Sequence, residues 1–183
     1  RRVFGDLTVT ENLEVGRQPP RRWADGSAAP VWTPERLFKL FPNLGEMPDR
    51  PGGRMSGGEQ QMLTVARTLM GNPILVLLDE PSEGVAPVIV EQMVHTIQKL
   101  KDQGLSILLS EQNIHFAELV SDRAYVLEKG QIHWHGTMRD LATSVKGIGL
   151  DKIQFVTVPN EPYVPDPNRV QWQASADQIW SAL

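Results

Sequence analysis

Two stretches decide the fold of this chain: Met55-Ser56-Gly57-Gly58-Glu59-Gln60-Gln61 and Ile74-Leu75-Val76-Leu77-Leu78-Asp79-Glu80-Pro81. The second is an uninterrupted aliphatic run, which is typical of a strand buried on both faces of a parallel sheet. The first leads into apolar positions at helical spacing, so a helix is predicted from Glu59 to Met70. Asn72-Pro73 ends that helix before the strand begins.

The aliphatic strand ends in two carboxylates, Asp79 and Glu80. Open α/β sheets bind ligands at the carboxyl ends of their strands. Asp79 could hold a Mg²⁺ ion through water, because hard cations prefer carboxylate oxygens. Glu80 could orient or deprotonate an attacking water molecule. The alternative is an acidic cap in front of a helix with Pro81 in its first turn.

Ser56, Gly57, Gly58 and Glu59 offer backbone N–H groups, a hydroxyl and the positive end of a helix, which together suit an anion. Glycine also lets a phosphate approach the backbone closely. A Ser-Gly-Gly turn by itself is more often a plain loop and helix cap. Its occurrence together with the acidic strand end favours a nucleotide site.

Other periodic segments complete an alternation of helices and strands. The predicted elements are a short helix starting near Thr8, a helix opened by Thr33-Pro34-Glu35, a helix over 88–101, a strand over 105–109, a helix over 113–120, a hairpin of 124–127 with 132–134, and a short helix over 137–142. This alternation predicts an α/β fold with βαβ units and right-handed crossovers. From about Gly147 onward four prolines and the loss of helical periodicity predict a tail that is partly extended or disordered.

Composition excludes several classes of function. The chain has 183 residues, a net charge of -4 and no cysteine, so disulfides and cysteine metal sites are ruled out. A net negative charge gives no global attraction to nucleic acid, so we expect no nucleic-acid partner. No apolar run reaches the roughly 18 residues needed to span a bilayer, so we expect no direct membrane insertion.

The stretch from about residue 1 to 145 resembles the later two-thirds of an ABC transporter ATP-binding subunit. Met-Ser-Gly-Gly-Glu-Gln-Gln is similar to that family's Leu-Ser-Gly-Gly-Gln signature, and the aliphatic strand resembles its Walker B segment. The resemblance implies that Glu80 is the catalytic glutamate and that Asp79 holds Mg²⁺ through water. Gln112, in Ser110-Glu111-Gln112-Asn113, stands at the family's switch position, where a histidine is usual. Glutamine can still hydrogen-bond a γ-phosphate, although it cannot carry a positive charge.

The departures from the general pattern point to one branch of the family. Val85 replaces the usual D-loop aspartate, and Ser-x-Gly-x-Ala-Pro with Glu-Gln-Asn resembles the branch that takes up branched-chain amino acids and related amides. No G-x-x-x-x-G-K-[ST] phosphate loop occurs in the 183 residues. We therefore expect an N-terminally truncated cassette that begins just past the family's Q-loop.

The resemblance implies three regions in a partial P-loop NTPase-like cassette: part of a helical subdomain over 1–54, the C-terminal part of the ATPase core over 55–146, and an extension over 147–183. It implies ATP and Mg²⁺, a second ATP-binding subunit in a homo- or heterodimer, and membrane permease subunits as partners. In the family's head-to-tail dimer Ser56, Gly57, Gly58 and Glu59 serve the site opposite to that of Asp79, Glu80 and Gln112. The expected location is cytoplasmic, peripheral on the inner face of the cell membrane.

Two other readings stay open. A catalytically inactive cassette fragment could serve as an interaction module, and non-transport ABC ATPases share these motifs.

His133 and His135 lie two residues apart on a predicted strand and could pair on a metal, although a solvated strand face explains them as well. Trp23 and Trp32 could dock a partner or anchor a loop.

Overall fold

The computed structural model describes residues 3–22, 26–128, 130–144 and 154–157. Its elements, in chain order, are α1 (Val9–Val15), α2 (Pro34–Leu40), α3 (Pro42–Gly45), the 3-10 turn η1 (Gly52–Arg54), α4 (Gly57–Leu69), β1 (Leu75–Asp79), α5 (Pro87–Asp102), β2 (Ser106–Glu111), α6 (Ile114–Val120), β3 (Arg123–Glu128), β4 (Gln131–Thr137), α7 (Met138–Ser144) and β5 (Gln154–Thr157). Helices and strands alternate, which confirms the predicted α/β class. Trp23 and all of the predicted extension 147–183 except residues 154–157 lie outside the described residues.

Helix starts follow the capping signals in the sequence. Thr8 and Ser56 each form a complete capping box, with Glu11 and Glu59 at the third helical position. The Thr33 hydroxyl accepts the backbone N–H of Arg36, and Pro34 opens α2. Such caps satisfy N–H groups that would otherwise lack partners at the start of a helix.

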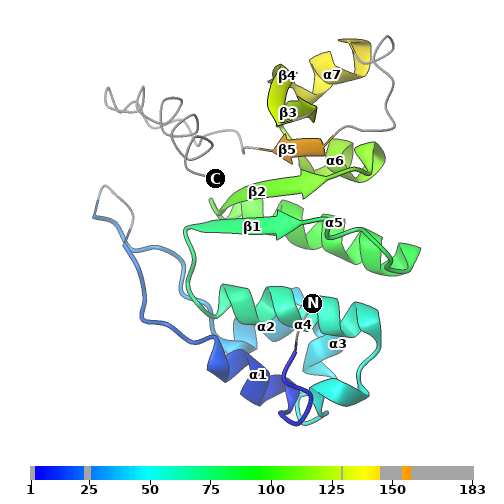
Figure 1. Ribbon diagram of the computed structural model, residues 1–183. Coiled ribbons are helices and arrows are strands. Elements are labelled where there is room, and N and C mark those ends of the chain that lie inside the picture. Colours follow the sequence, from blue (N-terminus) through cyan, green and yellow to red (C-terminus); the bar gives the residue numbers. More distant parts are fainter. Residues whose placement is uncertain (1–2, 23–25, 129, 145–153, 158–183) are drawn as a thin grey trace.

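The sheet has five strands in the order β1-β2-β5-β3-β4 (Figure 1). β1 and β2 are parallel, with Asp79 opposite Ser110. β5 is antiparallel to both of its neighbours, so β2 and β3 run in the same direction and are separated by one strand. β3 and β4 form the predicted hairpin. The position of β5 is new information, because the sequence predicted only a partly extended tail.

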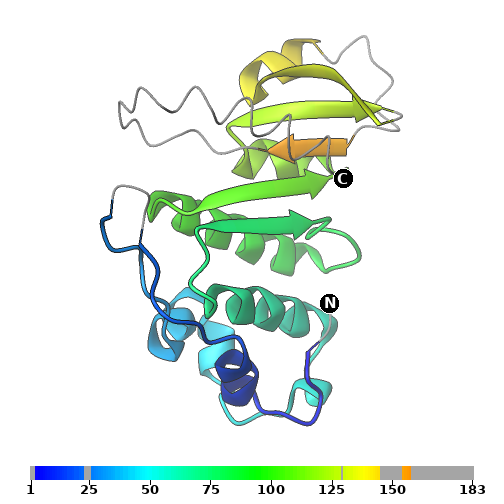
Figure 2. The ribbon, with the colours of Figure 1, turned by 60° about the vertical axis from the view of Figure 1, so that its left-hand side comes forward.

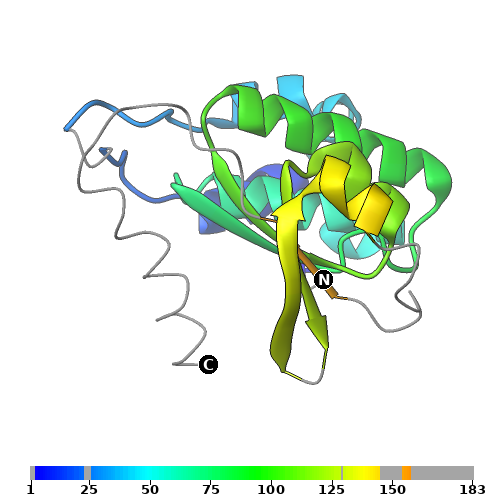
Figure 3. The same ribbon diagram turned by 90° about the horizontal axis from the view of Figure 1, so that it is seen from above.

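Helices cover the sheet and continue beyond its edge. Viewed from above, α5 and α6 lie together on one face of the sheet (Figure 3). α4 runs beside β1, on the side away from β2, and α1 to α3 lie beyond it (Figures 1 and 2). No helix in the described part of the chain is long and apolar enough to cross a membrane.

One hydrophobic core joins the helical region to the parallel strands. It includes Leu13 of α1, Leu37 of α2, Leu63 of α4, Val76 of β1 and Ile107 of β2, all at most 3% exposed. A smaller cluster under the hairpin contains five buried residues of α6, β3 and α7: Ala117, Ala124, Val126, Met138 and Leu141. Since the first core crosses residue 54 without a break, the boundary proposed there stays a prediction.

Two aromatic and histidine signals have local explanations. Trp32 is 3% exposed in the main core, and the Arg36 guanidinium lies 5.0 Å from its ring centroid. It therefore anchors a loop. His135 stacks on Tyr125 across the hairpin, with ring centroids 5.7 Å apart. Within the described residues no group of three His, Cys, Asp or Glu side chains is placed to hold a metal ion.

Candidate functional site

Asp79, Glu80 and Gln112 meet at the carboxyl ends of β1 and β2. The two strands are in parallel register, and Asp79 pairs with Ser110. The backbone N–H of Glu80 donates to the Ser110 carbonyl at 2.8 Å and extends the ladder by one residue. The side-chain amide of Gln112 then donates to Oε1 of Glu80. Parallel pairing thus brings together two side chains from different sequence segments.

Glu80 has an unusual backbone conformation. Its φ is +43°, in the left-handed region that side chains other than Gly, Asn and Asp rarely adopt. Pro81 follows directly, and the Glu83 N–H donates to the Glu80 carbonyl at 3.2 Å to close a turn. The turn directs the chain from the end of β1 toward α5. Backbone strain of this kind occurs preferentially at functional sites.

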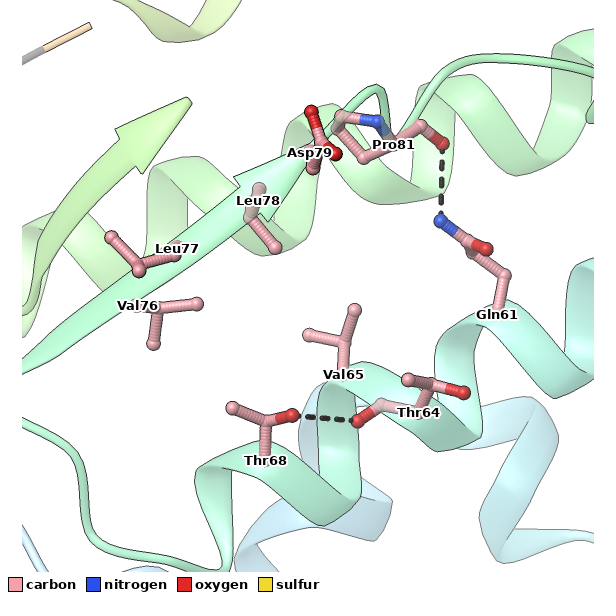
Figure 4. Close-up of a pocket in the computed structure, with 9 residues that line it drawn as sticks. All are labelled: Gln61, Thr64, Val65, Thr68, Val76, Leu77, Leu78, Asp79 and Pro81. Atoms are coloured by element: carbon pink, nitrogen blue, oxygen red, sulfur yellow. Dashed lines mark hydrogen bonds between the residues drawn. The ribbon is translucent and has the colours of Figure 1, made fainter. Parts of the chain in front are cut away.

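Asp79 lies beside a cavity between α4 and β1. The cavity has a volume of about 240 Å³, and Gln61, Val65, Val76 and Asp79 are among its lining residues (Figure 4). The Gln61 amide donates to the Pro81 carbonyl at 3.3 Å, which ties the first turns of α4 to the turn after β1. Among the described residues, the Oε1 atom of Gln61 is a buried side-chain oxygen without a hydrogen-bond partner. No role was predicted for Gln61 from the sequence.

The chemistry of these donors fits a hydrated Mg²⁺ ion and not a closed metal cage. Asp79 is exposed and offers one carboxylate at the strand end. Mg²⁺ usually keeps several waters and is held by one or two carboxylates together with phosphate oxygens. Asp79 would hold the ion through water, and the ion would neutralise phosphate charge when a nucleotide is bound.

Ser56 caps α4, and Gly57, Gly58 and Glu59 form its first turn. Ser56 is exposed, and its Oγ accepts the Glu59 N–H at 3.3 Å while Glu59 Oε2 accepts the Ser56 N–H at 2.7 Å. Nη1 of Arg50 lies 3.9 Å from Oε1 of Glu59. Ser56 and Gly57 therefore lie at the surface at the start of the helix.

The two glycines of this turn have different surroundings. A Cβ atom at Gly57 would meet nothing within 4 Å, whereas a Cβ at Gly58 would lie 2.6 Å from Cγ1 of Ile89 in α5. A side chain at position 58 would therefore force Ile89 or the helix to move. Gly57 leaves the helix start open, as an approaching phosphate would require.

Glu111 is another residue of the site for which the sequence predicted no role. The side chain is 2% exposed and accepts backbone N–H groups from both segments of the site. A signal was present in the sequence: Ile107, Leu109 and Glu111 alternate along β2, so strand periodicity predicts that Glu111 points into the core. A carboxylate on the buried face of a strand requires hydrogen-bond partners.

Comparisons with known proteins agree with this fold and arrangement. A family model described as ABC transporter matches residues 1–83. An ATP-binding cassette of an ABC transporter, MJ1267, superposes with a TM-score of 0.62 at 27% identity, over 80% of this chain and 63% of that one. The chain belongs to the ABC transporter family of ATP-binding proteins.

Individual relatives are more specific. The chain is 45% identical over 146 residues to the high-affinity branched-chain amino acid transport ATP-binding protein BraG of Pseudomonas aeruginosa, covering 80% of this chain and 60% of BraG. It is 35% identical over 140 residues to the probable branched-chain amino acid transport ATP-binding protein LivF of Archaeoglobus fulgidus, covering 76% and 57%. The lipopolysaccharide export ATP-binding protein LptB of Escherichia coli strain K12 is 35% identical over 99 residues, covering 54% and 41%. The chain thus spans 60% of the length of BraG and a smaller share of the other two relatives.

Proposed function

We propose that this chain is part of the ATP-binding and ATP-hydrolysing subunit of an ABC importer for branched-chain amino acids or related amides. The observation that carries the proposal is the 45% identity to BraG, together with the meeting of Asp79, Glu80 and Gln112 at one sheet edge. The similarity to LptB keeps lipopolysaccharide export as the competing substrate class.

The proposed roles follow from position and chemistry. Asp79 holds Mg²⁺ through water, and Glu80 orients or deprotonates the water that attacks the γ-phosphate. Gln112 hydrogen-bonds the γ-phosphate and, before nucleotide binds, Glu80. Ser56, Gly57, Gly58 and Glu59 contact nucleotide held mainly by the other subunit, through a hydroxyl and the exposed start of α4.

The proposed partners are a second ATP-binding subunit and membrane permease subunits, with the protein peripheral on the cytoplasmic face of the membrane. A related cassette, MJ0796, which is 20% identical and has a TM-score of 0.58, was solved as a dimer. Its likeness to this chain concerns the fold alone. The dimer of this chain is proposed from the exposed Ser56 turn, which lies at the start of α4 and not at the strand ends that carry Glu80 and Gln112.

Leucine uptake by a chimera tests the proposal. Residues 1–146 of this chain would replace the aligned part of BraG in cells that lack BraG, and uptake of labelled leucine would be measured. We expect uptake to return with the chimera and to be lost when the chimera also carries Glu80→Gln. A chimera that assembles with the permease but supports neither uptake nor ATP hydrolysis would overturn the importer assignment and favour the interaction module. An assembled chimera that hydrolyses ATP without uptake would favour another ABC ATPase.

A further inference from the structure

Glu111 is a buried carboxylate. In the described part of the chain its hydrogen bonds come from backbone N–H groups. Oε1 accepts from Gln112 at 2.9 Å and from Asn113 at 3.0 Å, and Oε2 accepts from Ser82 at 3.3 Å. A buried carboxylate needs such donors, because desolvation without them is costly. The two oxygens are thus divided between two segments of the chain.

These segments are the two halves of the candidate site. Ser82 belongs to the turn that follows Asp79 and Glu80, while Gln112 and Asn113 follow β2. One side chain therefore links the turn that carries Glu80 to the segment that carries Gln112. A second link is the bond from the Glu80 N–H to the Ser110 carbonyl. The Glu80–Gln112 hydrogen bond spans the ends that these links hold in place.

We propose that Glu111 is a positioning residue that sets the distance between Glu80 and Gln112 by bridging Ser82 to the Gln112–Asn113 backbone. Glu111 is buried and acts through these neighbours without contacting nucleotide. The inference deepens the proposed ATP site, but its geometry holds whether or not the chain transports amino acids. It can therefore be tested without ATP.

The bridge requires both side-chain oxygens of Glu111 to accept hydrogen bonds. Three N–H donors converge on the side chain from two sides, and a carboxylate is an acceptor at both oxygens. A glutamine at this position has one acceptor oxygen, so its NH₂ group must face one set of N–H donors. With the oxygen kept toward Gln112 and Asn113, the link to Ser82 is lost although the side chain keeps its size.

The test is nuclear magnetic resonance of the ¹⁵N-labelled 183-residue chain with Glu111→Gln. The side-chain amide signals of Gln112 report its bond to Glu80, and Glu80→Ala supplies their reference position without that bond. We expect Glu111→Gln to move the Gln112 side-chain signals toward that reference. We also expect hydrogen exchange of the Ser82 backbone amide with solvent to accelerate by about tenfold, which is the effect of losing one hydrogen bond. Glu118→Gln, an exposed change of the same kind on α6, should leave both readouts unchanged.

A merely structural role predicts a different result. Loss of general stability would accelerate exchange alike in the strands of the core and leave the Gln112 side-chain signals of the folded molecule in place. That outcome, or no change at all, would overturn the proposal. If Glu111→Gln does not fold, Glu111→Asp serves in its place. Its carboxylate is one methylene shorter and cannot span both segments, so the same selective changes are expected and a uniform response would again count against the bridge.

Discussion

The side-chain amide of Gln112 donates a hydrogen bond to Oε1 of Glu80, a residue 32 positions earlier in the chain. The two residues lie just past the ends of adjacent parallel strands, where Asp79 is opposite Ser110. Glu80 reaches this bond from a left-handed backbone conformation with φ of +43°. The contact thus depends on the register of β1 and β2 and on the left-handed backbone of Glu80. The energetic cost of that backbone conformation can be measured separately from the hydrogen bond.

Glu80→Gly should be more stable than Glu80→Ala. Both variants lose the bond to Gln112, but only glycine adopts a positive φ without a steric cost, which is about 1 kcal/mol for other residues. Denaturation by urea would measure the difference in the free energy of unfolding. At Glu91, exposed within α5, alanine should be more stable than glycine by about 0.5–1 kcal/mol. The same order at both positions would contradict the strained conformation of Glu80.

Gly58→Ala should destabilise the fold by about 1–3 kcal/mol, because the new methyl group must displace Ile89 or the helix. The added Cβ would lie 2.6 Å from Ile89 Cγ1. Gly57→Ala is the matched control, since its Cβ position is open, and should change the free energy of unfolding by less than about 0.5 kcal/mol. Adding Ile89→Ala should reduce the cost of Gly58→Ala. Additive effects of these two substitutions would argue against the contact.

Leu77→Lys should reduce self-association of the chain. β1 is the first strand of the sheet, and Leu77 is 67% exposed on it beside Leu75 at 45%. An unpaired edge with exposed apolar side chains favours pairing with another molecule, and a lysine opposes it. Sedimentation velocity at increasing concentrations would measure the association. Leu119→Lys, at a 46% exposed position on α6, controls for the added charge and should have a smaller effect.

Glu11→Gln should weaken the acid dependence of stability. The Thr8 backbone N–H, followed by the Thr8 hydroxyl, lowers the pKa of Glu11 in the folded state. A lowered folded pKa contributes stability above the unfolded value, near 4.3, and this contribution is lost as the pH falls through the folded pKa. The wild-type chain should therefore lose more stability than Glu11→Gln between about pH 6 and pH 3. Thr8→Ala keeps the backbone donor and should retain most of the wild-type dependence; equal slopes for wild type and Glu11→Gln would refute the prediction.

Local signals in the sequence predicted much of the fold. The capping pair Thr8–Glu11 located the start of α1. The aliphatic run located β1, but its predicted burial on both faces was wrong, because Leu75 and Leu77 are exposed. Each of these signals lies within a few residues of the element that it specifies. The family resemblance further named Asp79, Glu80 and Gln112 as site residues. The structure joins Glu80 to Gln112 and places Asp79 at the same strand end, and their roles stay a prediction.

The remaining features depend on contacts between distant segments. The close approach of Gly58 to Ile89 cannot be read from a Ser-Gly-Gly turn, because it arises where two helices pack. Glu111 becomes a link only once Ser82 is folded against it. β5 has four residues, and its partners lie in β2 and β3, so no local pattern specified its place.

The place of β5 has a consequence for the sheet as a whole. It meets β2 and β3 through three residue pairs on each side, whereas β1 and β2 share five pairs. Loss of an edge strand leaves the remaining strands of a sheet paired, and the next strand becomes the new edge. Loss of β5 would instead divide the sheet into two two-stranded pieces, β1–β2 and β3–β4. Residues 154–157 therefore join the two halves of the sheet.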